Sequence, residues 1–208
     1  LSEVNSDKIL KNIELAGRTC YKSEDLITDD SSKNFVSMII SRGHESVLEH
    51  EKITIKFICD RGVSHEIVRH RIASFSQEST RYCNYSRDKF DNQLTFIIPN
   101  WLNIDECEII NTPRLNLSDS DLWLNSMQYA ESNYNGLIVL GWKPEQARSI
   151  LPNSLKTEIV VTANLREWRT IFKQRTAKTA HPQMRELMRP LLDELKIKLQ
   201  PIFDDITY

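Results

Sequence analysis

The segment Arg69–Arg81, RHRIASFSQESTR, constrains the fold more than any other stretch of the chain. In a protein whose formal net charge is −2, it gathers four cation-capable side chains and four hydroxyls, at Arg69, His70, Arg71, Ser74, Ser76, Ser79, Thr80 and Arg81. Apolar residues interleave these charges, which predicts partial burial, and buried cations need partners. Arginine offers a planar fork of donors that suits phosphate, and hydroxyls add short donors beside it. The segment therefore predicts a phosphate site, and the alternative is a solvated basic helix end.

The residues before this segment predict a short helix that carries it. Ser64 suits the N-cap and Glu66 suits the first turn, which would place the cations at the C-terminal end. Successive helical residues are about 100° apart, so Arg69, His70 and Arg71 would sweep about 200° and could not all face one small pocket. They would need several anionic partners, or one partner long enough to wrap around.

Length and composition predict one globular domain spanning residues 1–208. Hydrophobic residues make up 40% of the chain and charged residues 27%, and no apolar run approaches the roughly 18 residues of a membrane span. The first ten residues contain neither the positively charged region nor the apolar region of a secretory signal, so no such signal is expected. The four cysteines, which lack CxxC spacing, argue against a zinc site and a disulfide framework and favour the reducing cytoplasm. The near balance of 27 basic and 29 acidic residues gives no global field for nucleic acid.

Periodicity predicts a mixture of strands and helices. Strands are expected at residues 51–59, where apolar and polar residues alternate, and at 93–99 and 158–164. Helices are expected at 6–17, ending at Gly17, at 32–42, at 118–140, at 144–152, at 165–175 and from Pro182 onward, interrupted at Pro190; residues 101–116 resemble a loop. Ser118 with Asp121 predicts a capping box and Asn164 an N-cap. The fold class is therefore α+β, with a mainly antiparallel sheet flanked by helices and no Rossmann fold.

Glycine patterns and histidine spacings restrict the cofactors. The chain has five glycines and no G-x-G-x-x-G, so the pyrophosphate of any bound dinucleotide would depend on side-chain cations such as those of Arg69–Arg71. The pairs His44-Glu45 and His65-Glu66 invite a zinc hypothesis. The histidine after His65 is His70, which misses the H-E-x-x-H spacing by one residue, so no metal site is expected.

A second basic group lies later in the chain. It comprises Arg148, Arg166, Arg169, Lys173, Arg175 and Lys178. In the helix expected after Asn164, Arg166, Arg169 and Lys173 share one face. That face is either part of an anion site or a solvated stripe opposite the apolar residues of the same helix.

The string RHR, followed by seven residues and Ser79, resembles the signature of the flavin-dependent thymidylate synthases, and the similarity extends from GRTCY to HPQMREL. The resemblance implies an enzyme that converts dUMP to dTMP, with methylenetetrahydrofolate as one-carbon donor, FAD as cofactor and NADPH as reductant. It also implies a homotetramer whose sites are shared between subunits, with no nucleic-acid or membrane partner.

The resemblance also implies roles for individual residues. The positions that match flavin contacts are His50, Arg69, His70, Arg71, Asn164, Arg166 and Thr170. The positions that match substrate contacts are Glu66, Gln77, Glu78, Ser79, Arg81, Arg148 and Arg175, with Ser79 and Arg175 assigned to catalysis. Some family members have asparagine in place of Thr170. The spacing from Arg175 to His181 also differs from that in some members, so the role of His181 stays open.

The nucleophile and the function class each have alternatives. No cysteine follows a proline, as the nucleophile does in the cysteine-dependent thymidylate synthases. No histidine and acid are spaced to activate Ser79 as a nucleophile. We therefore interpret Ser79 as a ligand of the nucleotide. One rival hypothesis is an RNA- or nucleotide-binding protein that uses Phe75, Tyr82 and Tyr85 for stacking. Another is a flavoprotein oxidoreductase acting on a different nucleotide, which would not depend on dUMP.

Overall fold

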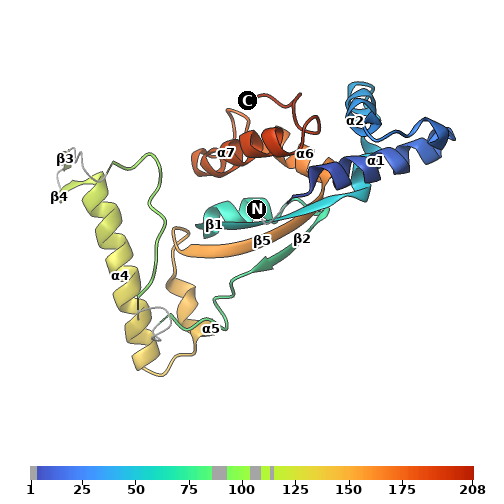
Figure 1. Ribbon diagram of the computed structural model, residues 1–208. Helices are drawn as coiled ribbons and strands as arrows, with labels where there is room; N and C mark the ends of the chain where they lie inside the picture. Colours follow the sequence, from blue (N-terminus) through green and yellow to red (C-terminus); the bar gives the residue numbers. More distant parts are fainter. Residues whose placement is uncertain (1–3, 86–92, 104–108, 113–114) are drawn as a thin grey trace. The chain divides into compact units, whose positions relative to one another are not determined.

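The computed structural model describes residues 4–85, 93–103, 109–112 and 115–208 (Figure 1). In chain order its elements are α1 (Ser6–Tyr21), η1 (Glu24–Leu26), α2 (Ser31–Ser41), η2 (Glu45–His50), β1 (Lys52–Asp60), α3 (Arg61–Ile67), β2 (Ala73–Gln77), β3 (Ile109–Thr112), β4 (Leu115–Ser118), α4 (Asp119–Val139), α5 (Pro144–Ala147), η4 (Arg148–Ile150), β5 (Lys156–Asn164), α6 (Leu165–Arg175) and α7 (Pro182–Lys198).

The main sheet has the strand order β1-β5-β2, and its strands run antiparallel (Figure 1). Backbone hydrogen bonds fix the β1–β5 pair at both ends, because Leu165 N donates to Glu51 O over 2.9 Å and Arg61 N donates to Leu155 O over 3.1 Å. A second, two-stranded sheet pairs β3 with β4. The α+β prediction is confirmed, and no strand order of the Rossmann type occurs among the described strands.

The chain divides into two compact units. Unit 1 comprises Leu1–Phe57, Val68–Phe75 and Val160–Tyr208, and unit 2 comprises Ile58–Ile67 and Ser76–Ile159. The boundaries fall inside β1, β2 and β5, so each strand of the main sheet contributes residues to both units. The single domain over residues 1–208 stays a prediction.

Unit 1 is built around Trp168 of α6, which is fully buried. Its ring stacks on Phe172 at 5.6 Å between centroids and lies 6.3 Å from Phe57 of β1. The indole nitrogen donates to Ile53 O over 3.2 Å, so its polar edge is satisfied. β1 supplies Ile53, Ile55 and Phe57 to this core while the intervening residues are exposed, as the alternating sequence predicts. Helix α6 is therefore held firmly against the sheet.

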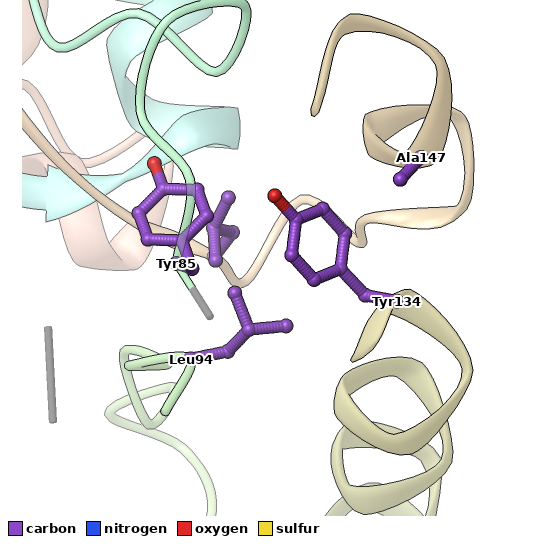
Figure 2. Packing of buried hydrophobic residues seen from close by; sticks show 5 residues of the cluster. Tyr85, Leu94, Tyr134 and Ala147 are labelled. Atoms are coloured by element: carbon purple, nitrogen blue, oxygen red, sulfur yellow. The ribbon is translucent and has the colours of Figure 1, made fainter. Parts of the chain in front are cut away.

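Unit 2 has a smaller core, made by Tyr85, Leu94, Tyr134, Ala147 and Leu155. The rings of Tyr85 and Tyr134 meet edge to face at 6.1 Å, and Figure 2 shows Leu94 beside them. Tyr134 comes from α4, whose capping box between Ser118 and Asp121 is present as predicted. This core holds the segment after β2 against α4 and α5.

Three helix predictions are wrong in their boundaries. Helix α1 continues past Gly17 to Tyr21, because the missing Cβ lets Phe35 of α2 approach closely. Helix α7 continues through Pro190, since the buried residues on both sides outweigh one lost backbone hydrogen bond. The helix expected at 144–152 is the short helix α5 followed by the 3-10 turn η4.

Two other segments also differ from expectation. Residues 93–99 form no strand but a single bridge, Phe96 to Leu155, because they meet the chain where it turns into β5. Residues 101–116 were expected to be a loop, yet 109–112 and 115–118 pair as β3 and β4. The remainder of that expectation, at 104–108 and 113–114, lies outside the described residues.

Candidate functional site

The RHR segment does not lie on a helix. Helix α3 begins at Arg61, where Asp60 Oδ1 accepts a hydrogen bond from Val63 N over 2.6 Å, and it ends at Ile67. The expected N-cap, Ser64, is inside that helix and donates to Arg61 O over 2.9 Å. The RHR residues form a turn before β2, so the argument from a helical sweep of about 200° does not hold. In this turn the side chains of Arg69 and Arg71 are exposed, whereas His70 is 6% exposed.

His70 is held between two residues of α6. Arg175 Nε donates to His70 Nε2 over 2.9 Å, and Glu167 Oε1 lies 3.5 Å from His70 Nδ1. Burial, and then the charge of Arg175, lowers the pKa of His70 to about 4, so the ring is neutral near pH 7. Burial also raises the pKa of Glu167. The resemblance implies that His70 and Arg175 serve different ligands, but the structure places them in direct contact.

A hollow of about 530 Å³ lies beside this turn. It is lined by Glu49, His50, Glu51, Lys52, Arg71, Ile72, Ala73, Ser74, Thr162, Ala163 and Asn164. Three predicted flavin contacts that are distant in sequence, His50, Arg71 and Asn164, thus share one hollow in unit 1. Its size lies within the usual range for ligand pockets.

The N-terminus of α6 borders this hollow and contributes to its electrostatics. Asn164 caps the helix as predicted, since its Oδ1 accepts from Glu167 N over 2.8 Å. We therefore expect a ligand to contact Asn164 through its amide nitrogen. A helix N-terminus favours anions, and Lys52 and Arg71 add positive charge to the lining. Of the two lining carboxylates, Glu49 is paired with Arg166.

Two predicted flavin contacts lie elsewhere on α6. Arg166 pairs with Glu49 and lines a different hollow, of about 390 Å³, that also includes Tyr21 and His44. Thr170 is exposed, and its hydroxyl donates to Arg166 O over 3.3 Å. Neither residue lines the hollow that contains His50, Arg71 and Asn164. Their flavin contacts stay predictions.

The predicted solvated stripe on α6 is wrong at Arg169. This side chain is 1% exposed and contacts Asp205 twice at 2.7 Å and Glu45 at 3.0 Å. It also donates to Ile202 O. Arg169 therefore ties the C-terminal segment to α6 and is a structural cation within unit 1.

Unit 2 contains the predicted substrate contacts Gln77 and Glu78. Gln77 Nε2 donates to Ser64 Oγ over 2.8 Å and to Thr157 Oγ1 over 3.2 Å. Glu78 accepts from Tyr85 Oη over 2.9 Å and lies 3.5 Å from Lys156 Nζ. Both side chains are thus fixed by neighbours that the sequence did not identify. A ligand contact of Gln77 would use its amide oxygen, because the amide nitrogen is already engaged.

Three further predicted substrate contacts, Ser79, Arg81 and Arg148, lie at or reach the turn that follows β2. Arg81 N donates to Ser79 Oγ over 3.3 Å, and Arg148 Nη1 donates to Thr80 Oγ1 over 3.3 Å. Arg81 is exposed, and its guanidinium lies 3.8 Å from Glu145 of α5. Ser79 Oγ contacts a backbone N–H group here. Activation of a serine nucleophile requires contact with a basic side chain instead. The guanidinium of Arg148, from a distant segment, therefore reaches the turn at Thr80, the residue before Arg81.

Glu66 and His181 complete the predicted set. Glu66 lies half-buried on α3, in unit 2, and His181 is the exposed N-cap residue of α7, in unit 1. Sequence reasoning missed Glu167 and Lys156, and it considered Tyr85 only for base stacking in the rival hypothesis. Glu167 had a weak signal, as an acid in the first turn of a helix, but nothing local showed that it faces His70.

Cys59 is buried, and the acidic groups of the described residues form no metal site. Burial raises the pKa of Cys59 to about 12, and Cys107 lies outside the described residues. No cluster of three or more His, Cys, Asp or Glu side chains suited to a metal ion occurs among the residues that the structure describes. Within the same residues, no helix combines the length and apolar character that crossing a membrane requires.

A family of known proteins matches most of this chain. Residues 4–199 match the family described as thymidylate synthase complementing protein. The chain is 33% identical over 180 residues to the flavin-dependent thymidylate synthase of Pyrococcus furiosus, covering 86% of this chain and 68% of that protein. It is 33% identical over 201 residues to that of Geobacter sulfurreducens, covering 93% and 80%.

Solved structures show the same fold. The flavin-dependent thymidylate synthase of Helicobacter pylori, complexed with FAD and dUMP, superposes with a TM-score of 0.71 at 24% identity. The alignment covers 96% of this chain and 95% of that one. The likeness therefore extends over nearly the whole length of both chains.

Proposed function

Because this chain belongs to the flavin-dependent thymidylate synthase family, we propose that it converts dUMP to dTMP with FAD as cofactor. Methylenetetrahydrofolate is the proposed one-carbon donor and NADPH the proposed reductant. The reaction balances as dUMP, methylenetetrahydrofolate, NADPH and a proton giving dTMP, tetrahydrofolate and NADP⁺. The observation that carries the proposal beyond family membership is the hollow in which His50, Arg71 and Asn164 meet.

The residues around this hollow fit a flavin dinucleotide. The exposed guanidiniums of Arg69 and Arg71 and the N-terminus of α6 suit a pyrophosphate without a glycine-rich loop. We propose that these groups hold FAD together with His50, Asn164, Arg166 and Thr170. When bound and reduced, the flavin supplies the reducing equivalents that turn the transferred methylene into a methyl group.

The residues of unit 2 are proposed to hold dUMP. We propose that Arg81 and Arg148 bind the phosphate with the hydroxyl of Ser79, because Arg148 reaches the turn at Thr80 and the exposed guanidinium of Arg81 belongs to the same turn. Gln77, Glu78 and Glu66 bind the nucleoside. Tyr85 and Lys156 fix the orientation of the Glu78 carboxylate. Ser79 acts as a ligand in this proposal and not as a nucleophile.

Arg175 is proposed to act on the uracil ring. A guanidinium keeps its positive charge at all working pH values, so it can polarise the uracil and stabilise the enolate-like negative charge that makes C5 nucleophilic toward the one-carbon unit. No enzyme cysteine is required in this scheme. The active assembly is proposed to be a homotetramer whose sites are shared between subunits.

The visible absorption spectrum of the purified protein tests the proposal. Under anaerobic conditions, the oxidised-flavin band should bleach with dithionite or NADPH. It should return only after dUMP and methylenetetrahydrofolate are both added, with dTMP formed in equal amount.

Two results would contradict this function. A colourless protein that takes up no added FAD would remove the flavin and favour a nucleotide-binding protein. A flavin whose oxidation state never responds to dUMP would indicate an oxidoreductase for a different substrate.

A further inference from the structure

The contact between His70 and Arg175 has a defined proton arrangement. Arginine Nε always carries hydrogen and can only donate, so His70 Nε2 must present its lone pair. A neutral imidazole then carries its hydrogen on Nδ1. The carboxylate oxygen Oε1 of Glu167 lies 3.5 Å from that nitrogen and can accept from it. Glu167 therefore selects the tautomer of His70 that can accept from Arg175.

This arrangement occupies the ring of His70 on both sides. The side chain is 6% exposed, and each ring nitrogen faces a residue of α6. A direct flavin contact through the ring would have to break one of these interactions. An apolar side chain would fill the same space without requiring a carboxylate to be buried, so packing alone does not account for Glu167.

The same arrangement restricts Arg175. This residue is the last of α6, and its long side chain would lose much conformational freedom on binding a ligand. The bond to His70 uses Nε and not the two terminal amino groups, which form the fork that recognises oxygen atoms. A fixed Nε therefore fixes the direction in which the fork points.

We propose that His70 and Glu167 are positioning residues that orient the Arg175 guanidinium for the uracil substrate, and that His70 does not itself bind the flavin through its ring. The inference rests on the proposed function, because it takes the substrate of Arg175 from that function. It changes the role that the resemblance implies for His70.

A matched pair of variants at His70 tests the inference. His70→Gln keeps an acceptor near the position of Nε2, whereas His70→Leu has similar volume and no acceptor. At saturating FAD, His70→Leu should lower kcat/KM for dUMP by roughly 10- to 100-fold, the usual loss for a hydrogen bond to a charged group. His70→Gln should stay within several-fold of the wild type, and both variants should keep wild-type FAD affinity.

A double-mutant cycle shows whether the effect passes through Arg175. In an Arg175→Ala background, His70→Leu should cause no further loss, because the group it positions is absent. At Glu167, the Gln variant keeps an acceptor for Nδ1–H and should be mild, whereas the Ala variant should resemble His70→Leu. Circular dichroism of each variant establishes that it is folded.

Specific results would overturn the inference. A His70→Leu variant with weakened FAD binding and unchanged kcat at saturating FAD would make His70 a flavin ligand. An equal loss with and without Arg175 would remove the coupling. The ¹⁵N spectrum of the five histidines gives a readout without turnover, since His70 should carry its proton on Nδ1 in the wild type and redistribute it in Glu167→Ala.

Failure of the proposed function has a different signature. If the wild type forms no dTMP and binds no dUMP, the proposed reaction is wrong whatever the variants do. In that case an Nδ1–H signal from His70 would still verify its contacts with Arg175 and Glu167. The inference would nevertheless be overturned, because Arg175 would have no substrate to be oriented for.

Discussion

At the scale of single residues, Arg81 gives a direct test of the phosphate site. Arg81→Ala should weaken dUMP binding by roughly 10- to 100-fold, because a charge-assisted hydrogen bond is worth roughly 1.5–3 kcal/mol. The free energy of unfolding should change little, because Arg81 is exposed and its 3.8 Å ion pair with Glu145 lies at the surface, where such pairs contribute little. Isothermal titration with dUMP measures the change.

The control for Arg81 is its own partner. Glu145→Gln removes the competing carboxylate and should leave dUMP affinity equal to that of the wild type or slightly higher. If Arg81→Ala binds dUMP as tightly as the wild type, Arg81 is not part of the site.

His70 predicts a pH dependence of stability. Its folded pKa of about 4 is below the ordinary value of 6.5, so the unfolded chain binds more protons between these values. The neutral ring therefore contributes stability above pH 6.5, and up to about 3 kcal/mol is lost as the pH falls through 4. Arg175 and Glu167 face the ring, and the raised pKa of Glu167 acts in the opposite direction.

The comparison with His70→Gln isolates this effect. Urea unfolding at several pH values should show the wild type losing more stability than His70→Gln between pH 6.5 and 4, with the Glu167 contribution present in both. Parallel pH profiles for the two proteins would contradict a buried, neutral His70.

At the scale of elements, two glycines should respond oppositely to the same substitution. A Cβ at Gly17 of α1 would lie 2.5 Å from Phe35 of α2, so Gly17→Ala should destabilise the protein by about 1–3 kcal/mol. Gly136 of α4 has nothing within 4 Å, so Gly136→Ala should stabilise by about 0.5–1 kcal/mol through helix propensity. Thermal unfolding of both variants provides the measurement, and an equal shift in both would show that the α1–α2 packing is not as tight as described.

The elements that sequence could predict are those with local signals. The alternation in β1, the capping box of α4 and the N-cap of α6 each follow from residues within a few positions of one another. Gly17 misled the prediction because a contact with Phe35, far along the chain, decides whether a glycine ends a helix or packs inside one. Pro190 misled it for the same reason, since burial of the flanking residues carries α7 through it.

The candidate site shows the same division. The motif indicated which residues matter, but its placement on a helix was wrong, because the turn after α3 depends on how β2 pairs in the sheet. The roles of Glu167, Tyr85 and Lys156 arise from contacts across the fold that no local spacing reveals. Residue types thus supplied the candidate site residues, whose roles stay predictions, and only the tertiary structure revealed which neighbours contact them.

At the scale of the whole molecule, α4 bears on the proposed tetramer. Of its 21 residues, all of them described, only Ser120 and Tyr134 are buried. Tyr129, Val139 and the following Leu140 are 71%, 85% and 78% exposed. A helix that buries so little within its own chain and exposes large apolar side chains is typical of an interface between subunits.

Light scattering after size exclusion should therefore give a mass about four times the 24.3 kDa of the chain. The double variant Val139→Glu with Leu140→Glu places two charges on this surface and should reduce the mass. Activity should fall with it, because the proposed shared sites would be incomplete in smaller assemblies. Gln128→Glu adds a charge to the same helix without removing apolar surface and should remain tetrameric. A wild type with the mass of one chain that still forms dTMP would contradict shared sites, since one subunit would then supply every residue that the reaction needs.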